Sequence, residues 1–234
     1  MVSLGGRHQG LPDLAVEWLG TVPYAEALEL QQQRVEARRK GGGQDGLLLL
    51  EHPPVVTLGR GAGTDNLRVS ESELAARGIA LHRVSRGGDV TYHGPGQLVG
   101  YLILDLSARE ERDVHAFLRR IEAALGEALG ELGVPARTLA GYTGVFVQPG
   151  PAEPAGKPPR KIASIGVGLR AWVTYHGFAL NLDLDLDAFE SMVPCGLDFV
   201  EMTSIARELG ADAPDDLAAR ARRVVGETFA RQWR

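Results

Sequence analysis

One amphipathic helix dominates the hydrophobic pattern of this chain. After Asp113, apolar residues recur at intervals of three and four, and the pattern stops before Gly133 and Pro135. A stripe of this period covers one face of an α-helix and is buried against another layer, with Asp113 as the N-cap. The stripe therefore predicts a layered globular fold whose core contains Phe117, Leu118, Ile121, Leu125, Ala128, Leu129 and Leu132.

Three further helices are predicted by similar signals. The first begins at Pro23 and ends at the glycines 41–43, and the last begins at Pro214. Between them, a capping box at Ser70 opens a short helix that Gly78 closes. The predicted apolar faces consist of Tyr24, Ala27, Leu28 and Val35 in the first helix and of Leu217, Val224, Val225 and Phe229 in the last.

Short apolar runs bounded by Gly and Pro predict the strands. These runs are 14–20, 47–50, 55–58, 79–84, 97–106, 145–147, 162–169, 172–175 and 178–182. The second and third runs are expected to be neighbours, and the last three a meander with turns at 170–171 and 176–177. Residues 148–160 contain five prolines and predict an exposed loop. Meanders with helices on one face of the sheet predict an α+β domain.

Composition restricts the domain organisation and the possible partners. A chain of 234 residues with 44% hydrophobic content can bury one substantial core, so we expect a tail at 1–13 and a single domain at 14–234, with a small C-terminal part from about residue 198. The net charge of −5 argues against a general nucleic-acid binder. No apolar run has the length of a membrane span, and residues 1–12 lack a signal-peptide core, so a cytoplasmic location is expected.

A glycine-rich polar segment is the first candidate functional element. It runs from Arg86 to His93 as Arg-Gly-Gly-Asp-Val-Thr-Tyr-His and continues into Gly94-Pro95-Gly96-Gln97. Glycines let a backbone approach a ligand closely, and Thr91, Tyr92 and His93 add polar groups. The segment predicts a binding loop, with a plain turn between two strands as the alternative.

The second candidate element is a single cysteine with an upstream lysine. Cys195 has no second cysteine with which to form an internal disulfide, and a lone thiol makes a poor metal site. Pro194 and Gly196 place it in a turn, where it can be a nucleophile; the alternative is a small buried hydrophobic residue. A nucleophilic thiol needs a base or a cation beside it. Lys161 can be either, or it is a solvated charge at the end of the basic run 157–161.

Together these segments resemble the lipoyl(octanoyl) transferase family. The family's Arg-Gly-Gly-x-x-Thr-aromatic-His stretch is similar to Arg86–His93, and its Gly-Pro-Gly-Gln-Leu-Val-x-Tyr stretch to residues 94–101. Its lysine segment matches residues 161–166, its His-Gly-x-Ala-x-Asn segment residues 176–181, and its Pro-Cys-Gly segment residues 194–196. The resemblance covers residues 14 to 230 in the same order and spacing.

The resemblance implies a fold, a reaction and a site. The expected fold is a mixed β-sheet flanked by helices, as in the catalytic domains of lipoate-protein and biotin-protein ligases. The expected reaction moves an octanoyl group from octanoyl-acyl carrier protein, through a thioester on Cys195, to a lysine of lipoyl domains. Cys195 and Lys161 would be catalytic. The acyl-binding residues would be Arg86, Gly87, Gly88, Asp89, Val90, Thr91, Tyr92, His93, Ser164, Ile165, Gly166, Gly177, Phe178 and Ala179.

The resemblance also bears on cofactors and partners. No ATP and no metal are expected, and the acceptors would be lipoyl domains of 2-oxoacid dehydrogenase E2 subunits and of the glycine cleavage H protein. Because such partners are typically acidic and this chain is net negative, docking is expected on a local basic patch. The candidates are Arg34, Arg38, Arg39 and Lys40 with Lys157, Arg160 and Lys161. His93 is a candidate for positioning the incoming amine, and His176 is interpreted as structural.

Two alternatives remain open at this point. An ATP-dependent lipoate- or biotin-protein ligase of the same fold would use a glycine-rich nucleotide loop, which residues 59–63 match only faintly. A non-catalytic module that binds carrier proteins would keep the groove but not need Cys195 or Lys161. Acylation of the cysteine without ATP separates the transferase from both.

Overall fold

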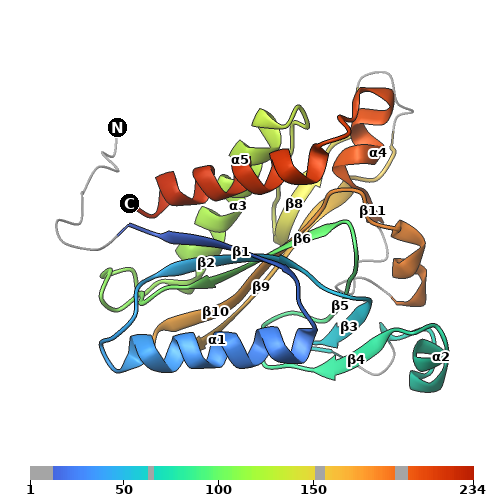
Figure 1. The fold of residues 1–234 in the computed structure, drawn as a ribbon. Coiled ribbons are helices and arrows are strands. Elements are labelled where there is room, and N and C mark those ends of the chain that lie inside the picture. Colours follow the sequence, from blue (N-terminus) through green and yellow to red (C-terminus); the bar gives the residue numbers. More distant parts are fainter. Residues whose placement is uncertain (1–12, 63–65, 151–155, 193–199) are drawn as a thin grey trace.

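The computed structural model describes residues 13–62, 66–150, 156–192 and 200–234. None of the helices in these ranges is long and apolar enough to cross a membrane. Figure 1 shows the arrangement of the elements. In chain order they are β1 (Ala15–Thr21), α1 (Tyr24–Arg39), β2 (Gly46–Glu51), β3 (Val55–Leu58), α2 (Glu71–Ala76), β4 (Ala80–Arg83), β5 (Val90–His93), β6 (Gln97–Ile103), α3 (Val114–Glu131), β7 (Arg137–Leu139), β8 (Tyr142–Val147), β9 (Arg160–Arg170), β10 (Val173–Asn181), a 3₁₀ helix (Leu186–Ser191), β11 (Glu201–Met202), α4 (Ile205–Leu209), a 3₁₀ turn (Gly210–Asp212) and α5 (Leu217–Gln232).

The main sheet is mixed and has the order β1-β2-β6-β10-β9-β8-β7, with β11 beside β9. The β1–β2 and β11–β9 pairs are parallel and the remaining pairs are antiparallel. The expected mixed sheet flanked by helices is therefore confirmed. The prediction that residues 55–58 lie beside 47–50 is wrong. After the corner at Pro53 and Pro54, β3 leaves the main sheet and forms a second, three-stranded sheet in the order β4-β3-β5.

Helices cover both faces of the main sheet, so the prediction of helices on one face is wrong. Along β2, Leu47 and Leu49 pack in the cluster that contains α3 and α5, whereas Leu48 and Leu50 pack in the cluster that contains Ala27 of α1. Figure 1 shows α1 on one side of the sheet and α3 and α5 on the other. A continuous apolar run such as 47–50 is the pattern of a strand that is buried on both faces.

The strand predictions are wrong for segments that contain polar residues or glycine and nevertheless form strands. Residues 90–93 form β5 instead of part of a loop, and β7 was not predicted. The turn expected at 176–177 does not exist, because β10 continues through it in unbroken register with β9. The predicted caps are confirmed: Asp113 accepts a hydrogen bond from the Ala116 N–H, and Ser70 forms a capping box with Glu73.

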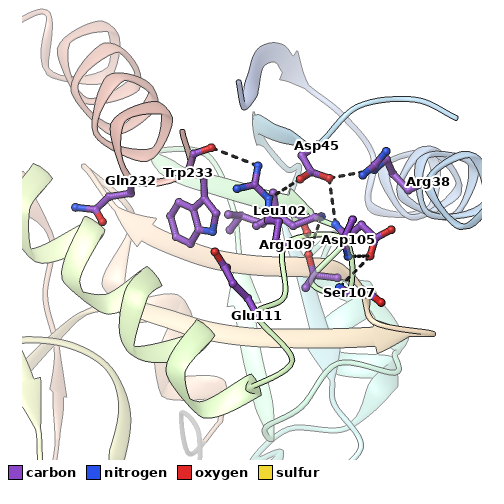
Figure 2. Close-up of polar contacts among 12 residues, drawn as sticks. Arg38, Asp45, Leu102, Asp105, Ser107, Arg109, Glu111, Gln232 and Trp233 are labelled. Atoms are coloured by element: carbon purple, nitrogen blue, oxygen red, sulfur yellow. Dashed lines mark hydrogen bonds and ion pairs between the residues drawn. The ribbon is translucent and has the colours of Figure 1, made fainter. Parts of the chain in front are cut away.

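A buried ionic network ties the ends of several elements together (Figure 2). The Asp45 carboxylate, just before β2, contacts Arg109 Nε at 2.6 Å and Arg38 Nε at 3.0 Å. It also accepts the backbone N–H of Asp105 at 3.1 Å. Arg109 reaches the carbonyl of Trp233 at the end of α5, at 3.3 Å. One carboxylate thereby joins α1, β2, the segment after β6 and the C-terminal helix.

Candidate active site

The candidate site is a pocket where the small sheet meets the α1 face of the main sheet. It contains about 480 Å³ of space free of atoms, part of it open to solvent. The wall is largely apolar or glycine, and the lining residues are Tyr24, Arg86, Gly88, Asp89, Thr91, His93, Val99, Tyr101, Ser164, Ile165, Gly166, His176, Gly177, Phe178 and Ala179.

The structure brings most of the acyl-binding residues predicted from the sequence to this pocket. They are Arg86, Gly88, Asp89, Thr91, His93, Ser164, Ile165, Gly166, Gly177, Phe178 and Ala179. Val90 and Tyr92 alternate with Thr91 and His93 along β5 and pack in the core beneath the small sheet instead. Gly87 lies behind the wall, where its N–H donates to the carbonyl of Val167 at 2.9 Å.

Arg86 anchors its own loop. Its guanidinium donates to both the carbonyl and the hydroxyl of Thr57, each at 2.8 Å, and to the carbonyl of Gly87 at 3.2 Å. Two other glycines let the loop pack tightly. A Cβ at Gly59 would lie 2.4 Å from the Gly88 carbonyl oxygen, and one at Gly166 would lie 3.0 Å from that of Gly87. The pocket therefore has a rigid wall in which backbone packs against backbone.

The Gly-Arg-Gly loop that follows β3 is fixed through its own amides. The N–H groups of Gly59, Arg60 and Gly61 donate to carbonyls of Asp89, Arg86 and Gly88 at 3.1 Å each. A phosphate-binding loop needs such N–H groups to point at its ligand. These three are already used within the protein.

Neutral aromatic side chains form one side of the site. His52 Nδ1 lies 2.6 Å from the carbonyl of Val22, so it carries the proton, and Nε2 accepts from the Tyr101 hydroxyl at 2.6 Å. Burial lowers the pKa of His52 to about 4 and that of His176 to about 3. It raises the pKa of Tyr24 to about 12. These groups carry no charge at neutral pH, which suits an uncharged ligand.

A hydrogen-bond chain fixes the tautomer of His93. Gln97 Nε2 donates to the Tyr92 carbonyl at 3.2 Å and to Asn181 Oδ1 at 2.9 Å. Gln97 Oε1 is then the acceptor for His93 Nδ1–H, at 2.7 Å. Burial lowers the pKa of His93 well below its usual value. The neutral ring in the pocket wall therefore keeps Nε2 as an acceptor, which fits the prediction that it positions an amine.

Lys161 is buried, so the alternative that it is a solvated charge is wrong. It lies on β9, is 2% exposed, and holds its Nζ 5.5 Å from the centroid of the Phe146 ring. A Cβ at Gly144 would lie 2.8 Å from Lys161 Cε, and the Gly144 N–H donates to Glu122 at 2.9 Å. Burial raises the pKa of Glu122, while Arg119 and Lys161 lower it. Lys161 thus shares an electrostatic cluster with a buried carboxyl group of α3.

The other predicted catalytic residue, Cys195, lies outside the described residues. So do its neighbours Pro194 and Gly196, and the chain is described again from residue 200. The catalytic roles of Cys195 and Lys161 stay predictions.

The predicted basic docking patch is largely neutralised. On α1, Arg34 pairs with Glu17 at 2.9 Å and Arg39 with Glu36 at 2.8 Å. Arg38 belongs to the buried network around Asp45 described above. Arg160 pairs with Glu208 at 2.7 Å, with both side chains largely buried. Arg38 and Arg160 are therefore structural residues.

Sequence reasoning missed several pocket residues. Tyr24, Val99 and Tyr101 were assigned to predicted helices and strands, and His176 was interpreted as structural. Their place in the pocket follows only from the pairing of the strands. In that register Gly177 lies beside Tyr101 and Gly166, and Ala179 lies beside Val99 and Ser164. These pairs put one face of three adjacent strands into the pocket.

Comparison with known proteins identifies a family for this chain. The family described as the lipoyl protein ligase A/B catalytic domain matches residues 23–226. The octanoyltransferase of Solibacter usitatus is 47% identical over 92% of this chain and 89% of its own length. That of Chloroflexus aurantiacus (strain J-10-fl) is 45% identical over 93% of this chain and 94% of its own length.

Solved structures show the same fold at lower identity. A bi-partite lipoate protein ligase of Thermoplasma acidophilum, studied with its E2 lipoyl domain, has a TM-score of 0.67 at 18% identity, covering 94% of this chain and 83% of its own. A lipoate-protein ligase A bound with ATP has a TM-score of 0.65 at 19% identity, covering 94% and 85% of the two chains.

The fold is thus that of the lipoate-protein ligases, and the candidate site is a largely apolar pocket that shares strand β9 with a buried lysine. At the identity and coverage of its curated relatives, the chain belongs to the lipoyl(octanoyl) transferase family. It is an acyltransferase that moves octanoyl groups in protein lipoylation.

Proposed function

We propose that the pocket holds the octanoyl chain and that Cys195 carries it as a thioester between octanoyl-acyl carrier protein and a lysine of a lipoyl domain. The observation that carries this proposal is that buried Lys161 lies on β9, three residues before Ser164, which lines the largely apolar pocket. A lysine beside a cysteine can take the proton of the thiol and, as a cation, stabilise the thiolate.

The proposed reaction has two acyl transfers. In the first, Cys195 gives its proton to Lys161 and attacks the thioester carbonyl. The bond to the carrier sulfur breaks, and Lys161 returns the proton to the leaving thiolate. In the second, the acceptor amine attacks the octanoyl-Cys195 carbonyl, a C–N bond forms, the C–S bond breaks, and the proton released by the amine restores the thiol. His93 Nε2 is the acceptor that orients the amine.

The same proposal excludes ATP and metal as reactants. A thioester already carries an activated acyl group, so exchange to Cys195 is nearly balanced and amide formation is favourable. The amides of residues 59–61 are used within the protein, which argues against a nucleotide loop there. Lipoyl domains as acceptors are supported by the fold relative from Thermoplasma acidophilum, which was studied with its E2 lipoyl domain. Both partners are proposed to meet the enzyme in the cytoplasm.

Intact-mass measurement tests the proposal. Octanoyl-acyl carrier protein without ATP should add one octanoyl group to the wild type and none to the Cys195→Ala variant. Lys161→Ala and Lys161→Arg should both slow the addition by orders of magnitude, because a guanidinium does not exchange its proton at neutral pH. Addition that needs ATP would favour a ligase, and no addition to the wild type would favour a non-catalytic module.

A further inference from the structure

His176 has an unusual backbone for a residue inside a strand. Among the described residues, the non-glycine residues with positive φ are Glu110, Ala171, Trp172 and His176. Ala171 and Trp172 lie at the tip of the β9–β10 hairpin. His176, with φ of 58°, lies within β10, yet the register with β9 continues on both sides of it. Strain of this kind persists where the surrounding structure imposes it, and it is frequent at ligand sites.

The left-handed conformation turns the imidazole toward the pocket. Along β10, Phe178 and Leu180 pack in the core on the α3 and α5 face, and Ala179 packs on the α1 face. Alternation would place His176 with Phe178. Instead its ring makes an edge contact, at 6.1 Å between centroids, with Tyr101, which packs on the α1 face. Like Phe178 and Ala179, His176 lines the pocket.

Gln31 of α1 holds His176 in this conformation. The His176 N–H donates to Gln31 Oε1 at 2.7 Å, and Gln31 is fully buried. Within the described ranges, His176 Nε2 is buried without a hydrogen-bond partner. Buried polar atoms of this kind call for a specific explanation. The backbone bond fixes the main-chain conformation from which the imidazole extends into the pocket.

The register separates His176 from Ser164, the pocket residue of β9 that is nearest to Lys161 in sequence. On β9, Ser164 lies three residues after Lys161 and pairs with Ala179, and Val167 pairs with His176. At a rise of about 3.3 Å per residue, Ser164 and Val167 are about 10 Å apart. An acyl chain whose carbonyl lies beside Ser164 and that runs along β9 reaches the imidazole after a distance close to the length of an extended octanoyl group.

We infer that His176 closes the inner end of the acyl pocket and sets the length of the chain that it accepts. The inference rests on the proposed function, because that function says which end of the pocket holds the reacting carbonyl. A chain longer than octanoyl would have to displace the imidazole ring from its place in the pocket wall. A smaller residue at this position should extend the pocket.

Titration with unreactive ligands tests this inference. The ligands are acyl-pantetheine analogues of six to fourteen carbons in which an amide replaces the thioester, so no transfer occurs. With wild type, Kd should fall about fourfold for each added methylene up to eight carbons and then level off or rise. With His176→Gly, which suits the positive φ and removes the ring, the fall should continue to ten or twelve carbons, a gain of about tenfold or more over wild type.

Two further variants make the test decisive. His176→Asn tolerates the same φ with a smaller side chain, so it should give an intermediate length limit, and it decides the question if the glycine variant does not fold. Ala171→Gly is the control, because it relieves a positive φ at the tip of the same hairpin. It should keep the wild-type dependence of Kd on chain length. Two results would overturn the inference. One is a wild-type affinity that still rises at twelve carbons, and the other is a folded His176 variant whose Kd depends on chain length as in the wild type. Because the analogues are inert, these outcomes are independent of whether Cys195 forms a thioester.

Discussion

Removing the charge of Asp45 should destabilise this fold more than most single substitutions. The Asp45 and Arg109 side chains are each 1% exposed, and their contact is 2.6 Å long. In Asp45→Asn the guanidinium of Arg109 stays buried without its counter-charge, and Arg38 loses the same partner. Breaking a buried pair by removing one member costs about 3–5 kcal/mol. That loss is a large share of a typical unfolding free energy of about 5–15 kcal/mol.

Urea unfolding, followed by far-UV circular dichroism, measures this loss. Glu127→Gln is the matched control, because Glu127 also pairs with an arginine, Arg231, but with 41% of each side chain exposed. Its effect should lie within the error of the measurement. In the double variant Asp45→Asn/Arg109→Met, much of the stability should return, since the uncompensated charge is gone. If Asp45→Asn is as stable as Glu127→Gln, the reasoning about the network is refuted.

Three other predictions concern the site. Burial lowers the pKa of His52 from 6.5 to about 4, so the unfolded chain binds the proton more readily than the folded one. The unfolding free energy should therefore fall as the pH drops from 6.5 towards 4. His52→Gln should make the melting temperature depend less steeply on pH in this range. Glu122→Gln keeps an acceptor for the buried N–H of Gly144 but removes the negative charge that is coupled to Lys161. The pH profile of octanoyl transfer should then move to lower pH. An unmoved profile would show that the carboxylate does not act on the lysine. Thr57→Val removes one acceptor of the buried Arg86 guanidinium at constant shape; it should lower the unfolding free energy by about 1.5–3 kcal/mol in urea titrations and raise KM for the octanoyl donor.

Elements with a strong hydrophobic period could be predicted from the sequence. Strands that form because they pair with a neighbouring strand could not. The stripe after Asp113 specified α3, because a 3.6-residue period on one face has few other solutions. β5 was missed, since Val-Thr-Tyr-His follows two glycines and its strand character depends on pairing with β3. The false turn at 176–177 came from a histidine and a glycine that the structure accommodates inside a strand. Propensity identifies turn-forming residues but not whether a neighbouring strand keeps them extended.

The site shows the same division between local and tertiary information. The glycine-rich motif placed Arg86, Thr91 and His93 in the pocket, because local motifs carry ligand chemistry. The burial of Lys161 depends on Phe146 and on Glu122 of α3, which no sequence spacing connects to it. The ion pairs of Arg34 and Arg160 could not be predicted for the same reason, and docking on the basic patch stays a prediction. A row of arginines on a helix looks solvated until its acidic partners, from other elements, are known.

On the proposed function, strand β9 has two tasks along its length. Near its start, Lys161 lies in a buried cluster with Glu122. From Ser164 to Gly166 the strand forms part of the largely apolar pocket wall that is proposed to bind the acyl chain. Substitutions in the wall should therefore change which chain binds, seen as Kd or KM, while those around Lys161 should change the rate of transfer with the chain already bound. A pocket variant that altered the rate alone would argue against this division.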